Sequence, residues 1–177
     1  MYFQDFLLIG FSVFFILLAA SVFAHMMFLV PYVPSKKRVV TRMIRAAKLK
    51  EGERVYDLGC GDGRLLLEAE KKVPVKTEGF EIAPLVYGLA WLRKKIAGSS
   101  MKLRFQNLFS ANLKRADVIF CYLLPHVMPR LRKKILRECR RGTRIVSNTF
   151  HIPGLTPTKV LKRNRKKGLP TVYVYIV

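Results

Sequence analysis

The chain has 177 residues, which is room for one domain with a short appendage. It carries 33 Lys and Arg residues against 11 Asp and Glu residues, so its formal net charge of +22 predicts attraction to polyanions. The three cysteines, Cys60, Cys121 and Cys139, show no C-x-x-C spacing. This argues against a metal site and favours reduced, buried thiols.

The N-terminal segment is strongly apolar. Residues 6–34 contain no Asp, Glu, Lys or Arg, and residues 6–24 are almost wholly Phe, Leu, Ile, Val and Ala. A helix over residues 6–24 would be about 28 Å long, close to the hydrocarbon thickness of a bilayer. A cleaved signal peptide would have a positive n-region and a shorter apolar core, and a buried core helix would not be apolar on every face. We therefore expect a retained transmembrane anchor within residues 1–30.

The flanking charges predict how this anchor is oriented. Only Asp5 and the terminal amine precede it, whereas five cations follow closely: Lys36, Lys37, Arg38, Arg42 and Arg45. The positive-inside rule then places the rest of the chain on the cytoplasmic face of a single-pass membrane protein. Residues 31–50 are expected to form a stiff connector and an amphipathic helix. The basic face of that helix would meet anionic lipid headgroups, at about 1 kcal/mol per cation.

From residue 51 onward, apolar runs of strand length alternate with helical patterns. Such alternation predicts an α/β domain over residues 51–177, with a Rossmann-like parallel sheet and right-handed crossovers. The last two runs predict an antiparallel hairpin, and short links after the third and fifth strands predict a trimmed version of the fold. The expected strands are residues 54–58, 76–82, 103–108, 116–123, 144–150, 158–161 and 171–177, and the expected helices are residues 65–72, 84–98 and 129–141.

A glycine-rich loop follows the first expected strand, with the sequence Asp57-Leu58-Gly59-Cys60-Gly61-Asp62-Gly63. Glycines at alternate positions let the chain turn sharply and let a ligand lie against the backbone, and the next helix offers its N-terminus to an anionic group. A dinucleotide fingerprint would place glycine where Arg64 stands, and no Gly-Lys-Ser/Thr sequence is present. The two carboxylates suit a ligand that has hydroxyls and positive charge.

A third acid, Glu81, closes the second expected strand at the position that binds a ribose diol in doubly wound folds. The chain therefore resembles the Class I, seven-β-strand methyltransferases, which use S-adenosyl-L-methionine. The resemblance implies that this cofactor binds to the glycine loop, to the three acids and to the residue after the third strand. The candidate cofactor-binding residues are Asp57, Gly59, Cys60, Gly61, Asp62, Gly63, Glu81 and Asn107.

Further motifs indicate one branch of these enzymes. They are Pro-Tyr-Val-Pro-Ser at 31–35, Asn-Leu-Phe at 107–109, Tyr-Leu-Leu-Pro at 122–125 and Gly-Thr-Arg-Ile-Val-Ser at 142–147. They resemble the membrane-anchored protein-lysine methyltransferases whose mitochondrial members modify the ADP/ATP translocase and the ATP synthase c-subunit. The resemblance implies a membrane-protein substrate and places Tyr122 and Pro125 on the substrate side, as candidate catalytic residues. Where these enzymes usually have Asp to accept from the adenine amino group, this chain has Asn107, which can accept through its carbonyl.

The implied reaction is a direct displacement in which a nucleophile attacks the sulfonium methyl carbon in line. Alignment of the reactants contributes several kcal/mol. A lysine acceptor has an unperturbed pKa of about 10.4 and is almost fully protonated at pH 7. The apolar, aromatic segment 120–125 could provide a low-dielectric pocket that favours the neutral amine, and Tyr122 could orient the amine or serve only as packing. His126 and His151 are read as surface polar groups rather than proton relays.

Two other classes of function stay open. A lipid, quinone or RNA methyltransferase fits the anchor or the charge, although amino-methylating nucleic-acid enzymes commonly have Asn/Asp-Pro-Pro-Tyr where this chain has Tyr-Leu-Leu-Pro. A non-catalytic, membrane-bound cofactor-binding protein is disfavoured, because it gives Asp57, Asp62 and Glu81 no reason to surround the same loop.

Overall fold

The computed structural model describes residues 3–28 and 32–177. The expected anchor and connector therefore fall partly outside the described residues, at positions 1–2 and 29–31. The first described element is the helix α1 (Phe3–Phe28), which is longer than the expected apolar core at both ends. Its stretch Gln4–Phe23 is long and apolar enough to cross a membrane, and its large apolar side chains are exposed from Phe6 to Phe23.

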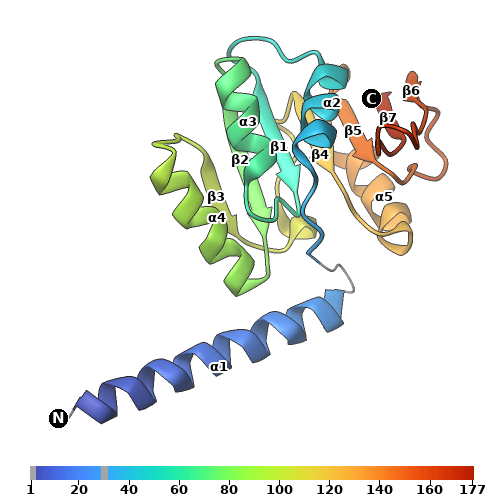
Figure 1. The fold of residues 1–177 in the computed structure, drawn as a ribbon. Helices are drawn as coiled ribbons and strands as arrows, with labels where there is room; N and C mark the ends of the chain where they lie inside the picture. Colours follow the sequence, from blue (N-terminus) through green and yellow to red (C-terminus); the bar gives the residue numbers. More distant parts are fainter. Residues whose placement is uncertain (1–2, 29–31) are drawn as a thin grey trace.

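Seven strands form a single mixed sheet in the order β3-β2-β1-β4-β5-β7-β6. The first five strands in the chain run parallel, and β7 lies antiparallel to both β5 and β6. This confirms the predicted Rossmann-like methyltransferase sheet and its antiparallel end (Figure 1). The strands are β1 (Arg54–Leu58), β2 (Lys76–Glu81), β3 (Lys102–Phe105), β4 (Val118–Cys121), β5 (Arg144–Asn148), β6 (Lys159–Leu161) and β7 (Val172–Ile176).

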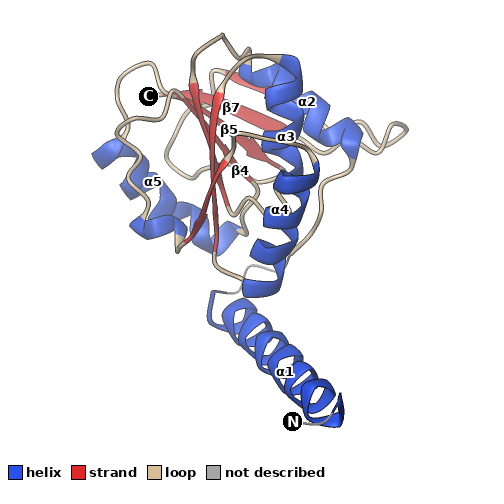
Figure 2. Cartoon of the chain, turned by 90° about the vertical axis from the view of Figure 1, so that its left-hand side faces the viewer, coloured by secondary structure: helices blue, strands red, loops and turns tan. Residues whose placement is uncertain are grey.

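Helices cover both faces of the sheet (Figure 2). Because side chains alternate along a strand, β4 serves both layers. Val118 and Phe120 pack with the helices of one face, whereas Ile119 and Cys121 pack with the helix of the other. The first face carries α2 (Lys37–Ala47), α3 (Arg64–Lys72) and α4 (Pro84–Ile96), and the second carries α5 (Met128–Glu138).

The fold is trimmed where the sequence predicts short links. Between β3 and β4 there is only a short 3-10 turn, η1 (Leu108–Ser110), and a second turn, η2 (Pro125–Val127), leads into α5. The third strand ends at Phe105 rather than at Leu108 as expected. The reason is local: the Asn107 side chain accepts a hydrogen bond from the Phe109 N–H at 2.9 Å, which caps a turn and ends the extended backbone.

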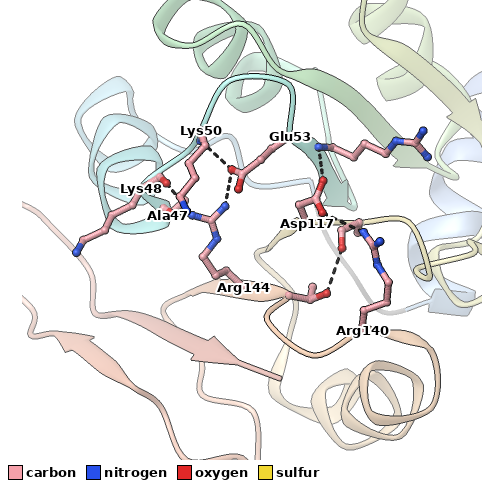
Figure 3. A network of polar contacts seen from close by, with 10 residues as sticks. Ala47, Lys48, Lys50, Glu53, Asp117, Arg140 and Arg144 are labelled. Atoms are coloured by element: carbon pink, nitrogen blue, oxygen red, sulfur yellow. Dashed lines mark hydrogen bonds and ion pairs between the residues drawn. The ribbon is translucent and has the colours of Figure 1, made fainter.

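A polar network fixes α2 to the amino ends of the strands (Figure 3). The Glu53 carboxylate accepts from the Arg144 guanidinium and, at 2.8 Å, from the Lys50 N–H. Arg144 also donates to the carbonyls of Ala47 and Lys48, at 2.8 and 2.7 Å, where α2 ends. The orientation of α2, and with it the chain that enters α2, is thus tied to β5.

Candidate active site

The carboxyl ends of the parallel strands surround a cavity of about 200 Å³. It is lined by the glycine loop, the end of β2, the segments that follow β3, β4 and β5, and the connector that precedes α2. Of the predicted site residues, it brings together Asp57, Gly59, Cys60, Gly61, Asp62, Glu81, Asn107 and Tyr122. Gly63 and Pro125 do not line it.

The glycine loop is fastened to the end of β2. Gly59, Gly61 and Gly63 have φ angles of 78°, 59° and 75°, the left-handed region that glycine adopts most readily. The N–H groups of Gly59 and Cys60 both donate to the Phe80 carbonyl at 3.0 Å. These bonds hold the loop over the sheet edge and leave its outer side toward the cavity.

Glu81 links this loop to the start of α4. Its Oε2 accepts from the Gly61 N–H at 3.0 Å, and its Oε1 accepts from the N–H groups of Ile82 and Ala83 at 2.8 and 2.9 Å. An ionised carboxylate has about four acceptor positions. Glu81 therefore keeps capacity on Oε2 to accept one further bond from a ligand hydroxyl in the cavity.

Among the acids of the site, Asp57 is the one without a hydrogen-bond partner in the described part of the chain. Its side chain is 6% exposed, lines the cavity and makes no hydrogen bond to the described part of the chain. Burial, and then the nearby carboxylates of Glu81 and Asp62, raise the pKa of Asp57 well above its ordinary value. A buried carboxylate without a partner favours a ligand that brings positive charge or hydrogen-bond donors.

Asp62, in contrast, is already neutralised by the protein. Arg64 donates to both of its oxygens, with the shortest contact 2.6 Å, and Arg93 lies 2.8 Å from Oδ2. Burial alone would raise the pKa of Asp62, but the hydrogen bonds from Arg64 and Tyr32 outweigh burial and lower it. A position inside the glycine loop predicts a ligand-facing charge; in the structure, the contacts of Asp62 with Arg64, Arg93 and Tyr32 also hold α3, α4 and the connector together.

The connector is a wall of the cavity, which the sequence analysis did not foresee. Residues 32–35 line it. Arg64 Nη1 donates to the Ser35 carbonyl at 2.9 Å, and the Tyr32 hydroxyl bonds to Asp62. A Cβ on Gly61 would lie 3.0 Å from the Tyr32 ring, so the loop glycine lets the connector lie close. The available signal was the Pro-Tyr-Val-Pro-Ser motif, which was read as family resemblance but not as part of the site.

An aromatic pair closes the other end of the cavity. The rings of Tyr122 and Phe150 are 6.4 Å apart between centroids and nearly parallel, at 17°, and both line the cavity. Phe150 was not predicted as a site residue. Pro125 is exposed and begins the η2 turn, and the exposed His126 and His151 do not line the cavity.

The thiols of Cys60 and Cys121 are buried, and that of Cys139 is partly buried. Burial raises the pKa of Cys60 well above its ordinary value and that of Cys121 and of Cys139 to about 12, so all three stay protonated near neutral pH. Cys60 lines the cavity, and its N–H is bonded to the Phe80 carbonyl.

Residues 57–159 match the family described as the ANTKMT methyltransferase domain. The matched segment contains the glycine loop, the acids Asp57, Asp62 and Glu81, and Tyr122 after β4. The chain belongs to this family.

Named relatives agree with this assignment. A protein-lysine N-methyltransferase of Saccharolobus islandicus is 37% identical over 151 residues, which cover 84% of this chain and 94% of that one. The adenine nucleotide translocase lysine N-methyltransferase of Mus musculus is 31% identical over 150 residues, 84% of this chain. This chain spans 63% of the length of the mouse enzyme.

The solved structures identify the cofactor. The RNA methyltransferase of Salinibacter ruber, in complex with S-adenosyl-L-homocysteine, superimposes with a TM-score of 0.77 and is 33% identical, over 82% of this chain and 94% of that one. S-adenosyl-L-homocysteine is what S-adenosyl-L-methionine becomes when its methyl group has been transferred. The predicted S-adenosyl-L-methionine-dependent methyltransferase is confirmed.

Proposed function

We propose that this family member transfers a methyl group from S-adenosyl-L-methionine to the ε-amino group of a lysine in a membrane-associated protein. The observation that carries the proposal is a cavity with Asp57, a carboxylate that has no hydrogen-bond partner among the described residues, at the glycine loop and an apolar, aromatic wall at the ends of β4 and β5. The lysine acceptor is also supported by the relatives named as lysine N-methyltransferases.

The cofactor would be held along the sheet edge. Glu81 would accept from the ribose hydroxyls through Oε2, Asp57 would face the α-ammonium group, and Asn107 would lie at the adenine end. Gly59 to Asp62 would support the cofactor through the backbone, with Gly63 holding the turn. When bound, the cofactor supplies an electrophilic methyl group on a sulfonium.

The acceptor would enter between the η2 turn and the aromatic pair. There the neutral amine would be held in line with the methyl group that the bound cofactor supplies, and the methylated ammonium would release its proton to water. Leu123 and Leu124 give the cavity an apolar wall, which favours the neutral amine. Tyr122 would contact the amine directly, whereas Pro125 would fix the turn that positions it.

Membrane attachment is part of the proposal. We divide the chain into an anchor (1–30), a connector with α2 (31–50) and a methyltransferase domain (51–177) on the cytoplasmic face. Support comes from the exposed apolar side of α1 and from a hollow of about 840 Å³ between α2 and the β6 region, lined by Lys36, Lys37, Arg38, Arg42, Arg45 and Lys159. None of the ion pairs in the described residues involves these six cations, so their charge is available to anionic lipid.

An RNA acceptor is the second candidate. It is favoured by the net charge of +22 and by the name of the Salinibacter ruber enzyme. Against it, the hollow between α2 and the β6 region contains no aromatic side chain on which a base could stack. A lipid or quinone acceptor draws support only from the apolar α1.

The test is a transfer assay on the full chain in detergent. Protein, or its Asp57→Asn variant, is incubated with radiolabelled S-adenosyl-L-methionine and membranes from cells that lack it. We expect Asp57-dependent label that is removed by protease and survives solvent extraction and nuclease. Label lost to nuclease or solvent would replace lysine by RNA or lipid as the acceptor.

A further inference from the structure

The chain leaves β5 through a strained turn. Thr149 has φ of 67°, a left-handed conformation that is costly for a β-branched residue. Three hydrogen bonds hold it there: Ser147 Oγ to the Phe150 carbonyl at 2.6 Å, the Phe150 N–H to the Asn148 carbonyl at 2.7 Å, and the Thr149 N–H to the Thr171 carbonyl at 2.8 Å. Strain that neighbouring bonds maintain in this way commonly marks a functional position.

The effect of this turn is to direct Phe150 to the cavity. Phe150 then lies almost parallel to Tyr122, which follows the adjacent strand β4. The ring of Phe150 is only partly buried against the core, so packing uses one part of it and the cavity receives the rest.

The position of this pair relative to the cofactor follows from the sheet order. Glu81 ends β2 and Asn107 follows β3, on one side of β1, whereas Tyr122 and Phe150 follow β4 and β5 on the other. With the ribose at Glu81 and the adenine toward Asn107, the methionine part and its methyl group point to the aromatic pair. This step rests on the proposed function.

We infer that Phe150 is an acceptor-positioning residue, which with Tyr122 forms an aromatic wall that selects a slender primary alkylamine such as a lysine side chain. The wall offers methylene groups a flat apolar surface and offers an ammonium the ring faces. With 6.4 Å between ring centroids, neither a base nor an alkyl chain fits between the two rings, because a contact of about 3.5 Å on each side requires about 7 Å; the amine would therefore lie along the wall.

The probe for this inference is n-pentylamine, which reproduces the four-carbon side chain of lysine together with its α-carbon. Its binding to the full chain in detergent, saturated with S-adenosyl-L-homocysteine, is followed by saturation-transfer NMR, and the affinity for S-adenosyl-L-homocysteine is measured by calorimetry. For Phe150→Ala we expect about 10-fold weaker amine binding, with S-adenosyl-L-homocysteine affinity within about two-fold. Phe150→Tyr should restore amine binding, because it keeps the ring.

The matched control is Phe105→Ala, which removes an exposed phenylalanine at the β3 edge of the sheet, outside the cavity lining. It should leave both affinities unchanged. The inference is overturned if the wild type does not bind n-pentylamine, if Phe150→Ala binds it as well as the wild type does, or if Phe150→Ala loses S-adenosyl-L-homocysteine instead. The transfer assay separates the two claims. If its label is protease-sensitive but Phe150→Ala binds the amine as the wild type does, the inference is rejected and the proposed function stands. If the label is nuclease-sensitive, the proposed function is rejected.

Discussion

Arg64 joins Asp62 to the connector: its Nη2 lies 2.6 Å from Asp62 Oδ2 while its Nη1 donates to the Ser35 carbonyl at 2.9 Å. Residues 32–35 of the connector are thereby held against the glycine loop. Because Tyr32 and Ser35 line the cavity, the strength of this attachment should influence how tightly the cofactor is held.

We predict that Arg64→Ala weakens S-adenosyl-L-methionine binding by about 10-fold, since hydrogen bonds to charged groups contribute about 1.5–3 kcal/mol and part of that loss reaches the cavity wall. Calorimetric titration of the full chain measures it. Arg104→Ala is the control, because it removes an ion pair with Glu78 at an exposed position on β3, and its affinity should match the wild type. Equal affinity of both variants would mean that the connector does not support the site.

Asp57→Asn should separate stability from function. Burial and two nearby carboxylates raise the pKa of Asp57, so its ionised form destabilises the protein when no cofactor is bound. The neutral amide should therefore raise the Tm at pH 7. Cofactor binding should fall by at least about 10-fold. Asp117→Asn is the contrast, because Asp117 accepts from the Arg54 N–H and from Arg140 and its loss should lower the Tm. A lower Tm for Asp57→Asn would contradict the account.

The same carboxyl predicts a pH dependence. Because the pKa of Asp57 is higher in the folded than in the unfolded chain, its contribution to stability is fully present below the ordinary value near 3.8 and is lost as pH rises through the raised folded value. Cofactor binding should have the opposite sign, since the α-ammonium group needs the ionised carboxyl. Affinity should fall as pH is lowered through the raised pKa, and this pH dependence should disappear in Asp57→Asn.

Asn107→Asp should increase cofactor affinity several-fold. The amide oxygen of Asn107 already caps the turn at Phe109, and a carboxylate keeps that bond while adding acceptor capacity and charge for the adenine amino group. Asn112→Asp is a closely matched control, because Asn112 caps its own turn by accepting from the Lys114 N–H at 3.0 Å outside the cavity lining. Calorimetry should show a gain for Asn107→Asp alone, and no gain would place adenine elsewhere.

Thr149→Gly should stabilise the protein. Relief of the left-handed strain at Thr149 contributes about 1–3 kcal/mol to the free energy of unfolding. Glycine also increases the conformational entropy of the unfolded chain, which lowers the free energy of unfolding by a smaller amount, about 0.4–1 kcal/mol. Thr156→Gly, at an exposed position with ordinary backbone, should lose about that smaller amount. Urea unfolding of both variants tests the pair, and equal destabilisation would remove the evidence for strain after β5.

The sheet and the cofactor side of the site could be predicted from the sequence because their signals are local. The run from Asp57 to Gly63 defines a strand, a turn and a helix start by itself, and Glu81 ends a readable strand. Phe150 and Tyr32 could not be recognised in the same way. Phe150 reaches the cavity through an unusual φ at Thr149, and Tyr32 reaches it because Arg64 binds a carbonyl 29 residues earlier in the chain.

Asp62 illustrates the remaining difference. Its place inside the glycine loop indicated a ligand-facing carboxylate, but sequence spacing does not reveal that Arg93, on α4, comes within 2.8 Å of it. The partners of a buried charge are set by packing between helices, which local patterns do not report.

The central claim is that the methyl group is accepted by a lysine ε-amino group. It is tested most directly by incubating the full chain with S-adenosyl-L-methionine that carries a deuterated methyl group and with membranes from cells that lack the protein, then sequencing the labelled peptides by mass spectrometry. We predict deuterated methyl groups on lysine in a membrane protein, and none with Asp57→Asn. Deuterated methyl on nucleosides, on lipid or on another side chain, with lysine unlabelled, would contradict it.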